Sequence, residues 1–328
     1  MRVGWAHTFR NRNSASGIFM YRAAEEMRRL GVDPVLIDLQ SLGPGIGPIR
    51  SRVRRELSGF ELVHAQYGSG CGFAVGWASC STCITLRGSD WYGLEGPGIL
   101  RVLHGRMAVK LTRSCLRHYR RIFVASRRMA EEVSSVAPTA SVEVMPSGID
   151  LKVFRPRARR EARRALGFAD LEAFVVLFAS AHPQNPIKRA DLARSAVASA
   201  RRRDPSIRFV EVTGVDPKHM PLIVSAADVI LLTSVHEGWP NIIKEGLACN
   251  VPFVSTDVSD LSAIADTCST CHVVDPRPEA IAGAILDLRS DPRTGSEDLR
   301  HFVESMDLTA TCRRLIEVYE EISGKPSP

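Results

Sequence analysis

The sequence predicts an α/β protein built from two successive doubly wound domains, in which helices cover both faces of a parallel sheet. The chain of 328 residues is longer than one ordinary core needs, and it suits two domains of roughly 150 residues each. Apolar residues make up 45% and charged residues 24%, which is typical of a globular protein. Short runs rich in Val and Ile alternate with longer amphipathic segments, and this alternation indicates βαβ units with parallel strands.

The first half contains six short apolar runs separated by segments with helical periodicity. The predicted strands are Arg2–Ala6, Pro34–Asp38, Leu62–Gln66, Thr82–Leu86, Ile122–Ala125 and Val142–Met145. The predicted helices between them are Ser16–Leu30, Pro48–Leu57, Gly98–His118 and Arg127–Ser135. Strand and helix therefore follow one another as a parallel sheet requires.

A boundary is expected where Gly148, Pro156 and a run of arginines interrupt the pattern. We therefore divide the chain into a first domain of residues 1–155, a second of 156–306, and a C-terminal helix within 307–328. The second domain is predicted from Ala173–Ala179, Arg189–Arg203, Ile207–Val212, Met220–Ala226, Val229–Thr233, Pro240–Cys249 and Pro252–Thr256. The apolar face of the final helix needs a surface to pack on, either back on the first domain or on its own domain.

Positive charge is concentrated in the first half of the chain. Residues 1–156 hold 22 Lys and Arg against 12 Asp and Glu, whereas the remainder holds 21 against 24. The stretch Ile99–Ile122 places leucines among basic residues, which predicts a helix with one apolar stripe and a cationic remainder. Such a helix could lie on an anionic membrane surface, hold an acidic substrate or simply be solvated.

The ends and the cysteines restrict the class of protein. The N-terminal residues reach Arg10 without an apolar run, and no segment approaches the ~18 apolar residues of a membrane span, so a cytoplasmic protein is expected. Of the eight cysteines, two pairs have zinc-like spacing: Cys80 with Cys83, and Cys268 with Cys271. Neither pair has a second pair nearby, so we expect reduced, buried cysteines and no metal.

The stretch from His236 to Asp260 contains the most informative chemistry. It follows the apolar run Asp228–Ser234, and its helix is predicted from Pro240 to Cys249, with Asn250 at the left-handed end. Such a helix begins at the carboxyl edge of a parallel sheet, where its N-terminus stabilises an anion such as phosphate.

Two glutamates accompany this helix start. Glu237 precedes it, and Glu245 lies about one turn inside. Carboxylates beside a phosphate site are repulsive unless they accept hydrogen bonds from hydroxyl groups. A nucleotide sugar, which carries both phosphates and hydroxyls, satisfies this requirement, although Glu237 could instead cap the helix.

At this point the sequence resembles the GT-B glycosyltransferases of family 4, over the chain from about Gly17 to the final helix. The most specific match is to the family pattern E-G-x-P-N followed by E-A-x-A-x-G-x-P-V-V. It consists of Glu237-Gly238-Trp239-Pro240-Asn241 and the segment from Glu245 to Val254. Weaker matches are Ser16-Gly17 before a helix, Val63-His64-Ala65-Gln66, Thr85-Leu86-Arg87-Gly88-Ser89-Asp90 and Ser147-Gly148-Ile149-Asp150 with Phe154 and Pro156.

The resemblance implies two domains that face a cleft and a role for each matching residue. Glu245 would hold the ribose of the donor nucleotide, and Glu237 would hold the donor sugar together with the backbone of the helix start. Lys188 matches the lysine that binds the diphosphate, and Gly17 would approach the same phosphates. The helix-start residues of the donor block are Gly238, Trp239, Pro240 and Asn241. A donor nucleotide such as UDP is implied as co-substrate, without a metal or other cofactor.

The chain also departs from the family pattern. The arginine a few residues before Lys188 is missing, and His182 or Arg189 is a possible substitute. Arg87 replaces a histidine, which makes it a candidate for an anion contact and for catalysis. His64 and Asp90, at the ends of predicted strands, are acceptor-side candidates or structural hydrogen-bonding residues.

The resemblance implies a retaining glycosyltransferase, with the donor on the second domain and the acceptor on the basic first domain. A glycan, a lipid-linked precursor and a small molecule all remain possible acceptors, and a nucleic acid acceptor is not excluded. Contact with the inner membrane surface through the basic domain is a further possibility. Two rival functions are a sugar-nucleotide epimerase of the same fold, and a non-catalytic basic module that binds nucleic acid or anionic lipid.

Overall fold

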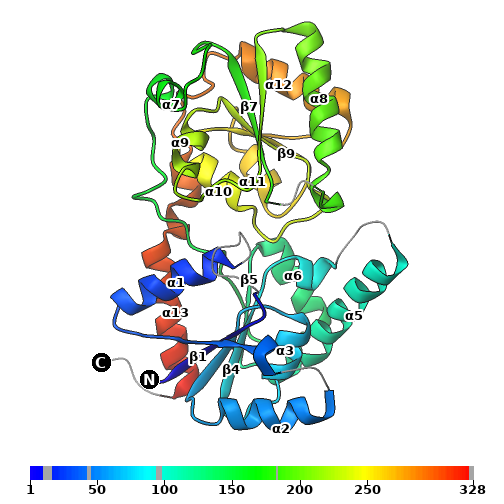
Figure 1. Cartoon of the computed structure of the whole chain (residues 1–328), viewed down its shortest axis with the longest axis vertical. Helices are drawn as coiled ribbons and strands as arrows, with labels where there is room; N and C mark the ends of the chain where they lie inside the picture. Colours follow the sequence, from blue (N-terminus) through cyan, green and yellow to red (C-terminus); the bar gives the residue numbers. More distant parts are fainter. Residues whose placement is uncertain (10–16, 43–45, 94–97, 182–183, 325–328) are drawn as a thin grey trace. The chain divides into compact units, whose positions relative to one another are not determined.

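The computed structural model describes residues 1–9, 17–42, 46–93, 98–181 and 184–324. The chain divides into two compact units (Figure 1). Unit 1 consists of Met1–Gly148 together with Leu308–Pro328, and unit 2 is Ile149–Asp307. Each unit contains one parallel sheet, so the predicted pair of α/β domains is confirmed. The observed division lies at Gly148, before the expected position at residue 155.

Unit 1 is built on a six-stranded parallel sheet with the order β2-β1-β3-β4-β5-β6. Its strands are β1 (Val3–His7), β2 (Val35–Asp38), β3 (Leu62–Ala65), β4 (Ser81–Leu86), β5 (Arg121–Val124) and β6 (Val142–Val144). The strand order reverses at β1, between β2 and β3. The carboxyl ends of β1 and β3 therefore flank the crevice where such sheets place ligands.

Helices cover both faces of this sheet. They are α1 (Ile18–Arg29), α2 (Ile46–Leu57), α3 (Ser69–Val75), α4 (Ser89–Tyr92), α5 (Ile99–Cys115), α6 (Arg127–Val136) and α13 (Leu308–Ser323). One face is packed by α1 and α13, with Trp5, Met20 and Tyr319 in its core. The opposite core includes Val75 and Met129. The apolar stripes of the helices are thus buried on the sheet, as amphipathic periodicity requires.

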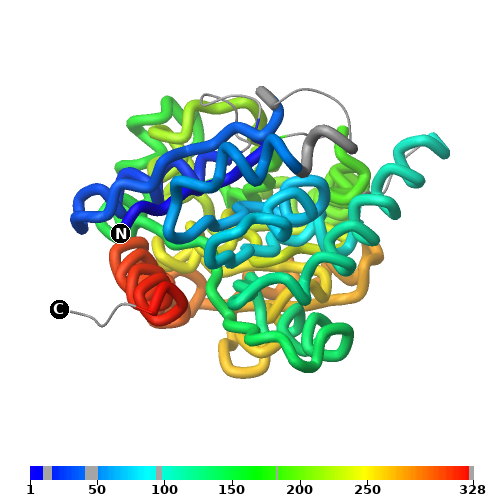
Figure 2. The backbone as a smooth tube through the Cα atoms, turned by 90° about the horizontal axis from the view of Figure 1, so that it is seen from below, coloured from blue at the N-terminus to red at the C-terminus, as the bar shows by residue number. Residues whose placement is uncertain are grey.

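The C-terminal helix α13 belongs to unit 1. It runs beside α1, and Figure 2 shows this with α13 in red and α1 in blue. Tyr319 is fully buried, and its hydroxyl accepts a hydrogen bond of 2.9 Å from Trp5 Nε1. At the base of α13, a Cβ on Gly148 would lie 2.7 Å from Leu308 Cα, so only glycine permits this approach. Side chains 314 residues apart in sequence therefore join the two ends of the chain in one core.

Unit 2 has a five-stranded parallel sheet with the order β11-β10-β9-β7-β8. Its strands are β7 (Phe174–Ala179), β8 (Ile207–Val212), β9 (Val229–Leu232), β10 (Phe253–Ser255) and β11 (His272–Val273). Its α-helices are α7 (Arg159–Ala165), α8 (Ala190–Arg203), α9 (Met220–Ser225), α10 (Asn241–Ala248), α11 (Leu261–Ala265) and α12 (Pro278–Ser290). The strand order reverses at β7, which places the switch point of this sheet between β7 and β9.

A buried ion pair anchors the start of β9. Arg163, from the arginine-rich run that forms α7, is 3% exposed and binds the carboxylate of Asp228 at 2.5 Å. Its guanidinium also donates to the carbonyl oxygens of Ala226 and Leu171. The other hydrogen bond to Asp228 Oδ2 comes from the Val175 amide in β7 at 2.6 Å. These bonds connect α7 to the starts of β7 and β9. The amino ends of both strands are therefore held in place.

Within the described residues, no helix combines the length and the apolar character that crossing a membrane requires.

Candidate functional site

The candidate donor site lies at the carboxyl edge of the unit 2 sheet. The connection after β7 contains the short 3-10 helix Pro186–Lys188, and the loop 233–240 joins β9 to α10. Because β7 and β9 are parallel neighbours at the switch point, both connections leave the sheet at the same edge. This topology brings Lys188 to the loop that carries Glu237.

Lys188 and Glu237 form an ion pair, although they lie 49 positions apart in sequence. The same Glu237 oxygen, Oε1, accepts a hydrogen bond of 2.7 Å from Ser234 Oγ. The two side chains are 29% and 16% exposed, so the pair is partly buried and still reachable by a ligand. A bound diphosphate can therefore compete with Glu237 for the lysine ammonium. The carboxylate is then able to accept hydrogen bonds from hydroxyl groups.

A set of side-chain hydrogen bonds fixes the backbone around this pair. Thr233 Oγ1 donates to the Lys188 carbonyl oxygen at 2.7 Å, and Arg189 Nε donates to the Thr233 carbonyl oxygen at 2.7 Å. On the other side, Thr256 Oγ1 binds the Ser234 carbonyl oxygen and Ser259 Oγ binds the Gly238 carbonyl oxygen, each at 2.7 Å. The loop is thus held from two directions, as a preorganised binding site requires.

One expected substitute for the missing family arginine has another task. Arg189 has a left-handed backbone (φ 46°), and its guanidinium donates to the carbonyl oxygens of both Thr233 and Ser234. These two hydrogen bonds therefore hold the backbone of the loop 233–240 in place. The alternative substitute, His182, lies outside the described residues.

The helix that follows the loop begins at Asn241, one residue later than predicted. Pro240 occupies its N-cap with φ −69°, and no side chain caps the first turn. Its first amide N–H groups can therefore point toward an anionic ligand, and the helix dipole adds a partial positive charge. Trp239 is 8% exposed and is packed in the protein, so its backbone is the part suited to a ligand contact.

Glu245 lies four residues into α10 and is half-buried. The helix packs tightly on β9, because a Cβ on Gly246 would lie 2.8 Å from Ile230 Cγ1, which explains glycine where the family pattern has alanine. Asn250 has φ 58°, as predicted for the helix end. Its Oδ1 accepts hydrogen bonds of 3.1 Å from the amide N–H groups of Leu299 and Arg300. The asparagine thus adds two hydrogen bonds that a glycine could not make.

Gly17, the predicted phosphate-approach residue of unit 1, is the N-cap of α1 and has φ 85°. A Cβ there would lie 2.8 Å from the ring of Phe9. Both the left-handed conformation and the aromatic neighbour therefore require glycine at this position. Ser16, the other half of that motif, lies outside the described residues.

His64 and Asp90, the acceptor-side candidates, are both held inside unit 1. The ring nitrogens of His64 are 2.5 Å from Tyr319 Oη and 2.7 Å from Thr85 Oγ1, and burial lowers the pKa of the imidazole well below its usual value. The side chain of Asp90 is fully buried. Its carboxylate accepts hydrogen bonds of 2.8 to 2.9 Å from the backbone N–H groups of Gly68, Arg87 and Gly88. These contacts favour the structural alternative for both residues.

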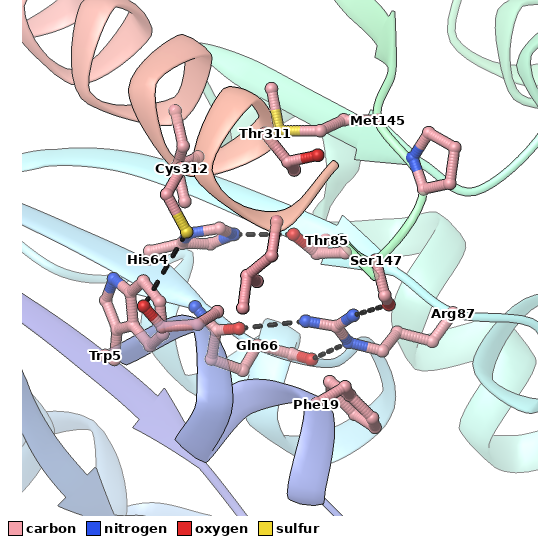
Figure 3. A pocket seen from close by; sticks show the side chains of 15 residues that line it. Trp5, Phe19, His64, Gln66, Thr85, Arg87, Met145, Ser147, Thr311 and Cys312 are labelled. Carbon is pink, nitrogen blue, oxygen red and sulfur yellow. Dashed lines mark hydrogen bonds between the residues drawn. The ribbon is translucent and has the colours of Figure 1, made fainter. Parts of the chain in front are cut away.

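Arg87 lies nearby at the end of β4 and lines a cavity in unit 1 (Figure 3).

Among the described residues, no group of three or more His, Cys, Asp or Glu side chains could hold a metal ion. Seven of the eight cysteines are buried, Cys80 is half-buried, and none forms a disulfide.

Comparison with known proteins relates the donor-site segment to a described family. Residues 188–291, which contain Lys188 and both glutamates, match the family described as glycosyl transferases group 1. A D-inositol 3-phosphate glycosyltransferase of Paenarthrobacter aurescens is 29% identical over 218 residues, covering 56% of this chain and 52% of that protein. Over residues 188–291 the chain is thus similar to glycosyltransferases, and its two parallel-sheet units have the GT-B fold of solved enzymes.

Other comparisons extend over more of the chain. The D-inositol 3-phosphate glycosyltransferase of Mycobacterium marinum is 25% identical over 305 residues, covering 78% of this chain and 62% of that protein. A sucrose-phosphate synthase structure from Thermosynechococcus elongatus aligns with a TM-score of 0.75 at 18% identity, over 99% of both chains. Anabaena HepE, solved in complex with UDP, has a TM-score of 0.72 at 13% identity, over 98% of this chain and 100% of that one. The chain spans about half the length of the first of these curated relatives.

Proposed function

We propose that this family 4-like protein transfers a sugar from a nucleotide-diphosphate sugar to an acceptor hydroxyl group. The observation that carries the proposal is the Lys188–Glu237 pair beside the uncapped start of α10. A lysine and a helix N-terminus provide positive charge for a diphosphate, and the two glutamates provide acceptors for sugar and ribose hydroxyls. Related proteins that have been solved with UDP are consistent with a UDP donor.

In the proposed reaction, the bond between the anomeric carbon and the diphosphate oxygen breaks while the acceptor oxygen bonds to the same face of the sugar. The acceptor proton passes to the departing phosphate oxygen. Lys188 and the helix dipole neutralise the charge that develops on the diphosphate, which is the largest electrostatic demand of the step. Because these groups provide the neutralisation without a metal ion, a metal-independent transfer is proposed. Retention of the anomeric configuration is proposed because the family resemblance implies it.

Incubating the purified protein with a panel of nucleotide sugars and candidate acceptors tests this function. We expect mass spectrometry to detect a glycosylated acceptor and released nucleoside diphosphate, at a rate that EDTA leaves unchanged. Conversion of a donor to its epimer without any acceptor would assign the rival epimerase function. Salt-sensitive nucleic acid binding without any nucleotide-sugar binding would assign the non-catalytic module.

A second surface supports a proposal about location. We propose that α5 docks unit 1 on an anionic membrane, so that the protein is cytoplasmic and peripheral. An exposed group of large apolar side chains, the α5 apolar stripe, consists of Ile99, Leu100, Leu103 and Met107, which are 76%, 79%, 52% and 60% exposed. Exposed basic residues accompany it on the same helix, namely Arg101, Arg106, Lys110 and Arg113, and α5 contains no Asp or Glu. Apolar insertion combined with uniform positive charge suits an anionic lipid surface.

Replacing Leu100 and Leu103 with serine is expected to weaken binding to vesicles that contain phosphatidylglycerol by at least about tenfold, because two inserted side chains lose their apolar burial. Vesicle co-sedimentation measures this. The control Val136→Ser with Val215→Ser removes exposed apolar side chains elsewhere and should bind as the wild type does. Equal binding by the stripe variant contradicts the proposal. A wild-type dimer that the stripe variant loses, without vesicle binding, would assign the stripe to a second copy of the chain.

A further inference from the structure

Unit 1 contains a small cavity that the proposed donor chemistry does not use. Its volume is about 50 Å³, and residues of β1, β3, β4, α1, α13 and the segment after β6 line it (Figure 3). One water needs roughly 10–15 Å³ of such space, so the cavity has room for a compact polar group rather than a single water. Its walls combine apolar side chains, among them Trp5, Met145 and Leu308, with the polar side chains of Arg87 and Gln66.

The guanidinium of Arg87 is a cation whose hydrogen-bond partners are neutral. Nε donates to the Gln66 carbonyl oxygen at 3.0 Å, Nη1 to Ser147 Oγ at 2.9 Å, and Nη2 to Gln66 Oε1 at 2.9 Å. The ring of Phe19 lies against it, with its centroid 3.9 Å from Cζ. Within the described chain, no carboxylate forms an ion pair with Arg87. Burial lowers its pKa to about 10, which still leaves the group protonated at neutral pH.

The carboxylate of Asp90 does not form an ion pair with this cation. Asp90 acts on Arg87 through space, and its two oxygens are occupied by three backbone amides. The positive charge therefore faces the cavity without a contacting counter-ion. Two of the five guanidinium N–H groups also remain after the three hydrogen bonds have been made.

Gln66 adds a second donor that lacks an acceptor. Its side chain is 2% exposed, and its Nε2 is buried without a hydrogen-bond partner. The orientation of the amide is physically determined, because the reversed form would place an NH₂ group against the guanidinium N–H. A buried donor without a partner destabilises the protein, so an acceptor that binds here regains that free energy.

The unused hydrogen-bonding groups of Arg87 and Gln66 are thus donors, and the one charged side chain among the lining residues is positive. An anionic group that accepts hydrogen bonds matches this environment, whereas a cation or an apolar group does not. The apolar walls strengthen the attraction, because they lower the local dielectric. We propose that the cavity binds one phosphate or carboxylate group through Arg87 and Gln66. This site does not depend on the donor site of unit 2.

The anion has two possible sources. It can be a substituent of the acceptor, or it can be a free anion that regulates the protein. The second source is reasonable because Gly148 and Leu308, which line the cavity, are the residues at which the chain leaves and re-enters unit 1. The chemistry recognised by Arg87 and Gln66 is the same in both cases.

Calorimetric titration of the full chain with inorganic phosphate and with acetate tests the site, at ionic strength matched with sodium chloride. The informative variant is Gln66→Glu, which supplies an internal carboxylate for Arg87 and removes the unsatisfied amide. We expect at least about tenfold weaker anion binding and a higher melting temperature than the wild type. The matched control Gln40→Glu makes the same change at an exposed position of unit 1 and should bind as the wild type does.

Thermal denaturation provides a second measurement, in which each protein is compared with itself in the presence and absence of phosphate. Phosphate should raise the melting temperature of the wild type and of Gln40→Glu, and it should leave that of Gln66→Glu unchanged. The proposal is overturned if neither anion binds the wild type, or if Gln66→Glu binds them with wild-type affinity. These readouts need no sugar transfer, so they remain informative if the proposed glycosyltransferase activity fails.

Kinetics then separate the two sources. Inositol 3-phosphate and inositol form one suitable acceptor pair with and without phosphate. If the anion belongs to the acceptor, inorganic phosphate competes with it, and Gln66→Glu raises KM for the phosphorylated acceptor alone. If the anion is free, phosphate changes kcat without competing with the acceptor.

Discussion

Replacing Lys188 with alanine is expected to lower kcat by about 10³-fold, equivalent to roughly 4 kcal/mol of lost transition-state stabilisation. In the proposed reaction, the negative charge on the diphosphate grows as the sugar leaves, and Lys188, which is held against Glu237, neutralises it. Its Nζ is paired with Glu237, and the side chain is 29% exposed, so the lysine is both positioned and reachable. Because the charge develops in the transition state, the loss should appear in kcat more than in donor affinity.

The control for this variant is Lys218→Ala. Lys218 is in the same unit, but its side chain is 70% exposed and pairs with Asp216 at the surface. Its replacement should leave kcat within about twofold, because an exposed pair contributes little. Steady-state kinetics with a saturating donor measure both variants. A Lys188→Ala enzyme that retains most of its kcat would remove the lysine from the catalytic machinery.

The sheets and the donor block could be predicted from the sequence because both depend on local signals. A buried parallel strand requires a short Val- and Ile-rich run, and β7 and β9 appear as such runs. Pro240 and Asn250 marked the start and end of α10 to within one residue, because their backbone preferences are intrinsic. The two-residue strand β11 was not predicted, because it is too short for any periodic signal.

The domain division depends on tertiary contacts. Pro156 and the arginine run suggest a linker, yet the preceding segment packs within unit 2. Phe154 is 1% exposed, and Arg300 donates to the carbonyl oxygens of Leu151 and Phe154. Nothing local in the sequence indicates an arginine 146 positions later as the partner. The observed division therefore precedes the composition change.

Some of the site chemistry could not be predicted from the sequence. The Lys188–Glu237 pair forms only because β7 and β9 are neighbours. The unsatisfied amide of Gln66 depends on where Arg87 directs its guanidinium, and the occupied ring nitrogens of His64 depend on Tyr319 from the far end of the chain. Residue type and spacing identify such candidates, and the distinction between a ligand contact and a structural contact requires the three-dimensional partners.

Replacing Glu245 with alanine is expected to weaken UDP binding by about 100-fold, or roughly 3 kcal/mol. A carboxylate that accepts ribose hydroxyls makes charge-assisted hydrogen bonds, each of which contributes about 1.5–3 kcal/mol. In the proposed donor site, the start of α10 meets the phosphates, and Glu245, further along the same helix, meets the ribose. The control Glu279→Ala, at an exposed position on α12, should not change the affinity.

The central claim is that unit 2 holds a nucleoside diphosphate, with the ribose at Glu245 and the diphosphate at Lys188 and the start of α10. Calorimetric titration of UDP and of inorganic diphosphate into the wild type and Glu245→Ala tests it most directly. The prediction is that Glu245→Ala loses about 100-fold in affinity for UDP and keeps its affinity for inorganic diphosphate. Equal UDP affinity in the two proteins would contradict the claim.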